Sequence, residues 1–343
     1  MKSAQLVAPR TIEVQEMPLP ADPAPGEVLV KLGSVGICGS DMHWYLEGSI
    51  YGLAAVYPQV LGHEPAAEVI AMGSRVTKFR PGQRVSIEPT ISCGRCEWCR
   101  RGQHNNCPTS RFMGSPQAPG LLREYAIIPA HNATLVPESF SYTQASLIEP
   151  VAVIMHMLEL VEIRPGDSVA ILGAGPMGLL AACVARHAGA AQVLMADKLP
   201  HRIGMAQDLV ATAAVPMGQF GELVLDRTRG RGVDIAIDAA GAAETINAAL
   251  AVTRLGGTFA LIGIPNHTPV GVDLFSLQAK EIRFLPVKRS NHQSEPAIAL
   301  LTSGAIPESI VTHRVGLEQA PGAFRMLAEY RDGVGKLAIE FPA

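Results

Sequence analysis

The stretch Ser168-Val-Ala-Ile-Leu-Gly173-Ala-Gly175-Pro-Met-Gly178 decides the fold of the second half of this chain. An apolar run of strand length leads into three glycines at G-x-G-x-x-G spacing, and an Ala/Leu-rich helical segment follows from Met177 to about Ala188. The next apolar run ends on Asp197, about 20 residues after the last glycine, as the pattern requires. Together these features form a dinucleotide-binding βαβ pattern.

Each glycine of this pattern has a physical role. Gly173 permits the tight turn, Gly175 lets the backbone approach a pyrophosphate, and Gly178 lets the helix pack close to its strand. The pyrophosphate is expected beside Pro176 and Met177, where free N–H groups and the helix dipole favour negative charge.

Asp197 is expected to accept hydrogen bonds from ribose hydroxyls and to repel a 2′-phosphate, which favours NAD over NADP. Arg202 is a further expected cofactor contact, and with Lys198 it leaves NADP open. Two plainer interpretations remain: a tight glycine turn that binds nothing, and a membrane span over the uncharged residues 168–185. The glycines and Pro176 argue against the span.

Composition indicates a globular protein of two domains, because the chain has 343 residues, of which 48% are hydrophobic and 17% charged. A formal net charge of -3, with no run of five basic residues, gives no support to binding of nucleic acid or an acidic membrane. Charged residues interrupt positions 1–20, so no signal-peptide core is present and we expect a cytoplasmic protein.

The order of apolar runs and turn signals predicts an α/β fold with a β-rich first domain. Strands alternating with helices after residue 168 predict a parallel, doubly wound sheet. We expect domains at 1–150, completed by about 288–343, and at 151–287. The expected strands are 4–7, 11–15, 27–35, 66–72, 124–129, 133–136, 169–172, 192–196, 234–238, 258–264, 281–287 and 336–341; the expected helices are 142–147, 151–161, 177–188, 202–209, 245–255 and 318–330.

Four cysteines, Cys93, Cys96, Cys99 and Cys107, lie within 15 residues at C-x2-C-x2-C-x7-C spacing. Their thiolates can reach one tetrahedral Zn²⁺ at about 2.3 Å each, and such a site has no open position. We therefore expect a structural zinc, with nearby arginines favouring the thiolates. Disulfides or an iron–sulfur cluster are the alternatives.

Cys38, His63, Glu64 and Glu149 are metal-competent side chains scattered along the first domain. Their spacing alone does not assemble them. Taken singly, His63-Glu64 is more often a solvated pair, and Cys38 is more often a small buried residue.

The fixed order of these motifs nevertheless resembles the zinc-dependent medium-chain dehydrogenase/reductase superfamily. It is carried by Cys38-Gly-Ser-Asp-Met-His43, Gly62-His63-Glu64, the four-cysteine lobe, Glu149-Pro150 and the glycine loop. Within the superfamily the chain is most similar to the polyol (sorbitol/xylitol) dehydrogenase branch.

The resemblance implies a GroES-like catalytic domain followed by a Rossmann NAD-binding domain, with two zinc ions per chain. It implies a catalytic zinc held by Cys38, His63 and Glu64, with Glu149 as a fourth ligand or the partner of a zinc-bound water. It also implies Arg289 as a contact to substrate hydroxyls.

The implied activity is oxidation of a secondary alcohol of a polyol or sugar to the ketone, with hydride transfer to NAD. Ser40 and His43 are the implied proton relay, although Ser40 could be a helix cap and His43 a surface residue. Two departures concern the pocket: Ala67 replaces the usual glycine, and Trp44 precedes Tyr45 where the family tends to have tyrosine directly after the relay histidine.

The alternative activities are those of a secondary-alcohol, butanediol or threonine dehydrogenase, which share the same motifs. A quinone-reductase-like binding protein without zinc chemistry is a third alternative, but such members generally lack the four ligands retained here. The resemblance suggests a homodimer or homotetramer, with the edges of the dinucleotide-binding sheets meeting.

Overall fold

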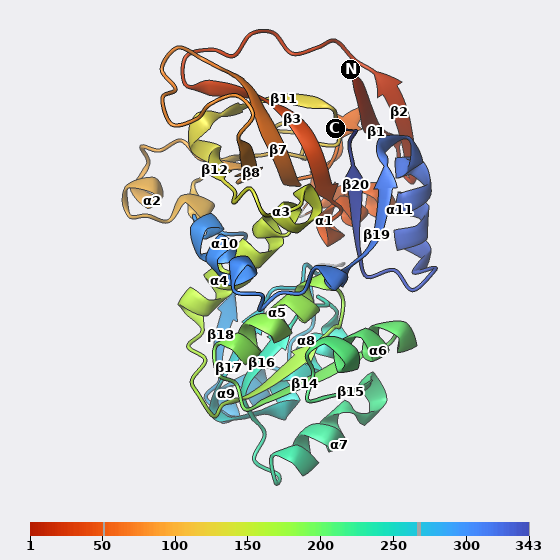
Figure 1. Ribbon diagram of the computed structural model, residues 1–343. Coiled ribbons are helices and arrows are strands. Elements are labelled where there is room, and N and C mark those ends of the chain that lie inside the picture. The colour runs from red at the N-terminus through yellow and green to blue at the C-terminus, as the bar shows by residue number, and fades with distance from the viewer. Residues whose placement is uncertain (51, 266–268, 343) are drawn as a thin grey trace. The chain divides into compact units, whose positions relative to one another are not determined.

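A computed structural model of the chain describes residues 1–50, 52–265 and 269–342 (Figure 1). The chain divides into two compact units. The first unit comprises Met1–Ala152, Asn291–Leu301 and Val311–Ala343, and the second comprises Val153–Ser290 and Thr302–Ile310.

The first unit is built on a seven-stranded sheet of order β12-β8-β7-β3-β20-β19, in which β11 also pairs with β3. A three-stranded sheet of order β2-β1-β6 and two short hairpins complete its β-structure. The strands are β1 (Lys2–Ala8), β2 (Thr11–Glu16), β3 (Glu27–Gly36), β4 (Ser49–Ile50), β5 (Leu53–Ala54), β6 (Gln59–Val60), β7 (Glu64–Met72), β8 (Arg84–Ile87), β9 (Thr90–Ile91), β10 (Arg111–Phe112), β11 (Tyr125–Pro129), β12 (Ala133–Leu135), β19 (Val311–Gly316) and β20 (Lys336–Glu340).

Strand β3 organises this unit because it pairs antiparallel with β7, β11 and β20. Val28, Val30 and Leu32 alternate with less buried neighbours along the strand, the period-2 pattern of a strand with one face on the core. The register with β7 shifts at two points, and such irregularities bend and twist a strand.

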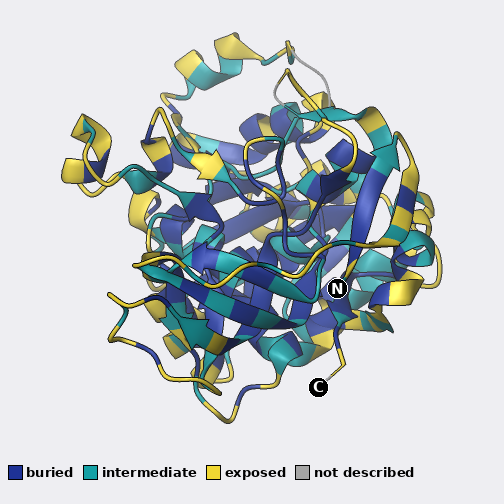
Figure 2. Cartoon of the chain, turned by 90° about the horizontal axis from the view of Figure 1, so that it is seen from above, coloured by how far each residue is buried: buried dark blue, intermediate teal, exposed yellow. Residues whose placement is uncertain are grey.

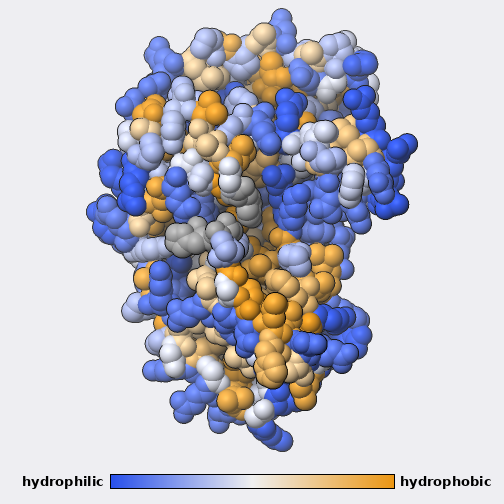
Figure 3. Space-filling view, turned by 180° about the vertical axis from the view of Figure 1, so that it is seen from behind, coloured by the Kyte–Doolittle hydropathy of each residue, from blue (hydrophilic) through white to orange (hydrophobic). Residues whose placement is uncertain are grey.

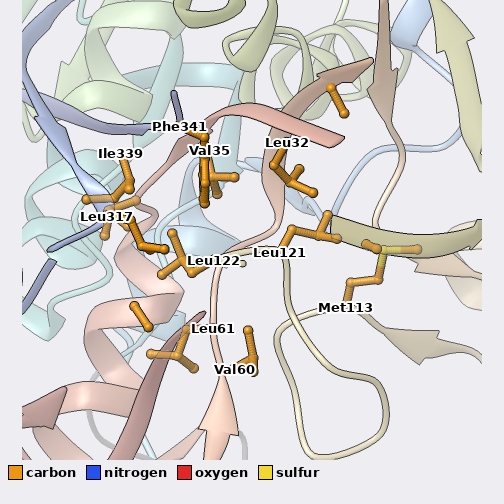
Figure 4. Packing of buried hydrophobic residues seen from close by; sticks show 14 of the residues in the cluster. Leu32, Val35, Val60, Leu61, Met113, Leu121, Leu122, Leu317, Ile339 and Phe341 are labelled. Carbon is orange, nitrogen blue, oxygen red and sulfur yellow. The ribbon is translucent and has the colours of Figure 1, made fainter. Parts of the chain in front are cut away.

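The core of the first unit joins segments from both ends of the chain. Leu32 and Val35 of β3 pack in the same cluster as Leu317, Ile339 and Phe341 of the C-terminal segment (Figure 4). Leu121 and Leu122 contribute from a loop. The C-terminal segment is therefore an integral part of this unit.

One set of helices lies in the first unit or in the segments that link it to the second unit. In α1 the C-terminal cap is Gly48 in the left-handed conformation, with φ 64°, which glycine adopts at little cost. These helices are α1 (Gly39–Glu47), α2 (Glu97–Arg100), α3 (Tyr142–Ser146), α4 (Ile148–Leu160), α10 (Ser294–Thr302) and α11 (Ala320–Glu329), with 3-10 turns η1 (His104–Asn106), η2 (Ala130–Asn132), η3 (Glu308–Ile310) and η4 (Leu317–Gln319).

The second unit contains a six-stranded sheet of order β15-β14-β13-β16-β17-β18, and every pairing in it is parallel. The order reverses at β13, as in a doubly wound dinucleotide-binding sheet. This confirms the predicted parallel sheet. Its strands are β13 (Ser168–Leu172), β14 (Gln192–Asp197), β15 (Ala213–Pro216), β16 (Val233–Asp238), β17 (Thr253–Leu261) and β18 (Arg283–Pro286).

Helices flank this sheet, namely α5 (Pro176–His187), α6 (Pro200–Leu209), α7 (Met217–Arg227), α8 (Ala243–Val252) and α9 (Leu274–Ala279). Figure 2 shows buried residues concentrated in the strands, and exposed residues on outer helices and loops. Across the described parts of the chain, every helix is too short or too polar to traverse a lipid bilayer.

The predicted helix 245–255 is wrong at its end. Helix α8 stops at Val252, and Thr253 begins β17, where it pairs with Val233. The Thr253 hydroxyl donates to the carbonyl of Ala249, and the Arg254 guanidinium donates to Asp234 of the neighbouring strand. The pairing of Thr253 with Val233 and the contact of Arg254 with Asp234 tie the chain to the neighbouring strand at the point where the predicted helix would have continued.

Candidate metal centres and cofactor loop

The first candidate site joins the start of α1 to the start of β7. Cys38 is the N-terminal cap residue of α1, and His63 and Glu64 lead into β7. One ligand atom from each of Cys38, His63 and Glu64 lies within 4.8 Å of the other two. The structure therefore brings together three predicted metal-site residues that sequence spacing could not assemble.

Asp41 contacts both segments that carry the cluster, and the sequence patterns did not predict this residue. Its carboxylate accepts the N–H groups of Cys38 and Gly62, both at 3.0 Å. The Asp41 Oδ1 atom also lies 3.4 Å from His63 Nδ1. The other imidazole nitrogen, Nε2, lies 3.3 Å from the Ser40 hydroxyl. This leaves Nε2 as the metal-facing nitrogen, since a carboxylate behind a ligating histidine typically fixes its tautomer.

Lys336 is a second residue that sequence reasoning missed. Its side chain, 3% exposed, reaches from β20 to contact the fully buried Glu64 carboxylate. Its ammonium also donates to the carbonyl of Ile37 at 2.9 Å. The other Glu64 oxygen, Oε1, has no hydrogen-bond partner among the described residues. A buried carboxylate oxygen without a donor is costly, so this atom fits a metal ion.

The negative groups of this cluster raise the pKa values of its two basic side chains, His63 and Lys336. Burial alone would lower the pKa of His63, but Asp41 and Cys38 raise it well above the usual value. Burial likewise opposes the charge on Lys336, yet Glu64 and Cys38 raise its pKa. Burial raises the pKa of Asp41, but His63 and the two N–H donors outweigh burial and lower it. The thiol, imidazole and carboxylate donors also suit zinc.

Glu149 lies in the first turn of α4, near this cluster but outside the three-ligand group. Burial is the main cause that raises its pKa to about 8, and Glu64 and Glu88 add to the rise while His63 opposes it. A nearby cation would reverse that shift, because opposite charge stabilises a carboxylate.

The predicted relay residues lie on one helix. Ser40 faces His63, whereas His43 lies 3.3 Å from Glu47 on the next turn of α1. Tyr45 is buried, with its ring 5.3 Å from that of Phe324, so it belongs to the core.

Two remaining predictions concern Ala67 and Arg289. Ala67 is fully buried in β7 opposite Leu32 of β3, and the sheet accommodates its Cβ. Arg289 lies in the second unit with φ 57° and is partly buried. Its role toward a substrate remains a prediction.

The second candidate site is the four-cysteine lobe around α2. The sulfurs of Cys93, Cys96, Cys99 and Cys107 lie within 4.8 Å of one another, and all four residues are free cysteines. Backbone N–H groups of Arg95 and Cys96 lower the pKa of Cys93 to about 6. For Cys96, the N–H of Cys99 lowers the pKa, but burial and the other three sulfurs raise it to about 11, so the four cysteines share no thiolate preference without a metal. Four sulfurs crowded together without disulfides fit one tetrahedral zinc.

The glycine loop adopts the close packing that its sequence predicts. Gly173 has φ 98°, and a Cβ on Gly178 would lie 1.8 Å from the Gly173 carbonyl oxygen. Gly175 is the N-terminal cap residue of α5, and Pro176 occupies the first turn. The first turn of α5, which includes Met177, therefore presents free N–H groups toward a phosphate.

Asp197 ends β14 and supports the glycine loop. Its carboxylate accepts the N–H of Ala174 at 2.7 Å and that of Leu199 at 2.9 Å. The Arg202 guanidinium lies 4.0 Å from the same carboxylate and close to Gly175. The predicted cofactor residues are thus gathered at the carboxyl end of β13 and β14.

Comparison with known families identifies the chain. Residues 24–138 match the family described as "Alcohol dehydrogenase GroES-like domain", and residues 176–303 match "Zinc-binding dehydrogenase". The chain belongs to the zinc-dependent medium-chain dehydrogenase/reductase superfamily. This confirms the expected GroES-like and Rossmann fold classes, and with them an oxidoreductase that uses zinc and a nicotinamide cofactor.

Relatives of this zinc-dependent dehydrogenase cover nearly its whole length. Sorbitol dehydrogenase of Bacillus subtilis is 34% identical over 342 residues, covering 99% of this chain and 97% of the relative. D-xylulose reductase A of Aspergillus niger is 32% identical, covering 94% and 92%. A solved structure of a putative zinc-binding dehydrogenase from Sinorhizobium meliloti, bound to NADP, is 31% identical with a TM-score of 0.90, covering 99% and 98%. These similarities confirm the predicted polyol branch.

Proposed function

We propose that this chain is an NAD-dependent polyol dehydrogenase that oxidises a secondary hydroxyl of a polyol or sugar to the ketone. The observation that carries the proposal is the convergence of Cys38, His63 and Glu64 within 4.8 Å. A thiolate, an imidazole and a carboxylate leave one position of a tetrahedral zinc open for a substrate. The names of the sorbitol and xylulose relatives support the polyol class.

Two zinc ions per chain are part of the proposal. The one at Cys93, Cys96, Cys99 and Cys107 is structural. The one at Cys38, His63 and Glu64, when bound, supplies Lewis-acid polarisation of the substrate hydroxyl, while NAD accepts the hydride.

The protein residues around that site would orient the substrate and carry the proton. Asp41 holds His63, and Lys336 holds Glu64. In this proposal Ser40, which lies beside His63, accepts the hydroxyl proton, and His43, one helical turn further along α1, passes it toward solvent. Glu149, just outside the ligand group, is proposed to act through water in preference to direct ligation.

For the cofactor, Asp197 supports NAD. Its carboxylate is 5% exposed and its charge lies beside the loop that would receive the dinucleotide, so a 2′-phosphate would meet a fixed negative charge. Gly173, Gly175, Gly178 and Arg202 complete the proposed contacts.

We also propose that the GroES-like domain spans about 1–150 and 288–343, apart from residues 302–310, which pack with the second unit, and that the Rossmann domain spans 151–287. We propose that the chain assembles as a homodimer or homotetramer. In the second unit Leu274 and Phe275 of α9 and Phe284 of the edge strand β18 are 66%, 81% and 38% exposed. Figure 3 shows a hydrophobic patch on the lower part of the molecule. Large exposed apolar patches typically mark association surfaces. A monomer on gel filtration would contradict the assembly.

A secondary-alcohol, butanediol or threonine dehydrogenase is the second candidate, because these activities use the same zinc and nucleotide motifs. A substrate panel separates the candidates. It contains polyols, sugars, simple secondary alcohols and L-threonine, each assayed with NAD and with NADP. We expect NADH formation with a polyol bearing vicinal hydroxyls. Turnover confined to simple alcohols or threonine would replace the polyol assignment with the second candidate.

A further inference from the structure

The pair formed by Glu64 and Lys336 spans a strand that carries no side chain at the crossing point. Strand β3 lies between β7 and β20 (Figure 1). Its last residue, Gly36, is in register with Glu64 on one side and with Ala338 on the other. A Cβ at Gly36 would lie 2.2 Å from Glu64 Oε2 and 3.0 Å from Lys336 Cε. The missing side chain is therefore what lets the two residues meet.

This pair is buried and asymmetric. Side-chain exposure is 0% for Glu64 and 3% for Lys336. The ammonium contacts Oε2 of Glu64 and donates to the Ile37 carbonyl, next to Cys38. Neither carboxylate oxygen accepts a hydrogen bond of ordinary geometry from the described residues, but Oε2 is the oxygen in contact with the ammonium. One carboxylate oxygen thus serves the lysine, and the other is free to face a cation.

We propose that Lys336 is a positioning residue that shares the Glu64 carboxylate with the metal ion and weakens metal binding at the Cys38–His63–Glu64 site. The inference rests on the proposed catalytic metal. Lys336 fixes the orientation of Glu64 through Oε2. Its positive charge also repels a divalent ion and reduces the negative charge that the carboxylate offers, and both effects are strong where water is excluded.

Two consequences distinguish this role from a structural one. Removing the charge while keeping the chain length strengthens metal binding at this site. The same change destabilises the metal-free protein more than the metal-loaded protein, because a buried carboxylate that loses its partner regains one only when a cation binds.

The test compares Lys336→Met and Lys336→Gln with Lys336→Arg, which keeps the charge. Gln retains a donor for the Ile37 carbonyl, so it gives a second folded variant if Met misfolds. Metal at the site is removed by dialysis against a chelator and replaced with Co²⁺. Affinity follows from competition with a chromophoric chelator, and the visible cobalt spectrum reports the ligand set. The thermal midpoint is recorded with and without metal.

We expect the Met and Gln variants to bind Co²⁺ roughly tenfold more tightly than the wild type. Their thermal midpoint should fall further in the metal-free form than in the metal-loaded form. The Arg variant should resemble the wild type. In a Glu64→Gln background, Lys336→Met should strengthen Co²⁺ binding by less than in the wild-type background, since the shared carboxylate is gone and only direct repulsion by the ammonium is removed.

Equal or weaker Co²⁺ binding by folded Met and Gln variants would overturn the role of Lys336, while leaving the proposed function intact. Wild-type protein that binds metal only at the four cysteines would overturn the proposed function itself, and the inference with it.

Discussion

His63 Nδ1 lies 3.4 Å from Asp41 Oδ1, and the same carboxylate accepts the backbone N–H groups of Cys38 and Gly62. One buried side chain therefore ties together the two segments that carry Cys38 and His63. The carboxylate sets the direction of the imidazole and the start of α1 at once. Asp41 therefore contributes both to metal binding and to the local fold of this region.

Replacing Asp41 with Asn should weaken the metal at Cys38, His63 and Glu64 by about 10- to 100-fold, as is typical for loss of a carboxylate behind a ligating histidine. Metal content after dialysis and chelator competition would measure the change. The matched control is Asp273→Asn, because Asp273 caps the exposed helix α9. An Asp41→Asn protein with unchanged affinity would show that Asp41 does not support the site.

Gly178→Ala should abolish tight NADH binding and leave the metal content unchanged. The new Cβ would lie 1.8 Å from the Gly173 carbonyl oxygen, so the loop must move, at a cost of about 1–3 kcal/mol. NADH fluorescence titration measures binding. As a control, Gly221→Ala in α7 meets no atom within 4 Å and should add about 0.5–1 kcal/mol of stability. Wild-type NADH affinity in Gly178→Ala would contradict the assignment of this loop.

Cys96→Ser should remove one metal ion per chain and lower the thermal midpoint, because the lobe around α2 depends on four sulfurs. Cys183→Ala is the control. Cys183 is buried in α5, and burial raises its pKa to about 11, so it stays a protonated core thiol. Metal analysis should give about two ions per chain for the control and one for Cys96→Ser. Equal metal content in the two variants would show that the lobe holds no zinc.

Stability should depend on pH through Asp234. Burial opposes ionisation of this carboxyl, but hydrogen bonds from Arg231, Ser168 and Arg254 lower its pKa below the usual value. A lowered native-state pKa gives a contribution that is complete above the unfolded-state pKa of about 4, and that is lost as the pH falls toward the native value.

Asp234→Asn should therefore cost about 2 kcal/mol at neutral pH, with a difference from wild type that shrinks below about pH 4. Thermal midpoints at several pH values measure it, with the exposed Asp226→Asn on α7 as control. If the difference in thermal midpoint between wild type and Asp234→Asn grew on acidification, the native-state pKa of Asp234 would not be lowered, and the prediction would be wrong.

Sequence patterns predicted the features of the fold that depend on residues close together in the chain. The glycine loop, the four-cysteine lobe and the alternation of strands and helices around them depend on neighbours in the chain, and the structure shows the lobe and the parallel sheet as predicted. The prediction for residues 253–255 was wrong because Arg254 is held by Asp234 of an adjacent strand. A contact between residues 20 positions apart cannot be recognised from the local pattern of a single helix or strand.

The remaining site residues depend on the tertiary fold. Cys38, His63 and Glu64 could be grouped only through resemblance to a family. Lys336 could not be found at all, since it meets the Ile37 carbonyl across 299 residues and is followed in its strand by three apolar residues. The one available signal for Asp41 was its position three residues after Cys38, which suits a carboxylate that caps α1.

The most direct test of the central claim compares Glu64→Gln with the wild type on the polyol that the wild type oxidises fastest. NADH production at 340 nm and NADH binding are measured on the same samples. The account predicts that turnover falls at least about 100-fold while NADH affinity is preserved, because the glycine loop and Asp197 are untouched. Wild-type turnover by Glu64→Gln would contradict hydride transfer from a substrate held at the Cys38–His63–Glu64 site.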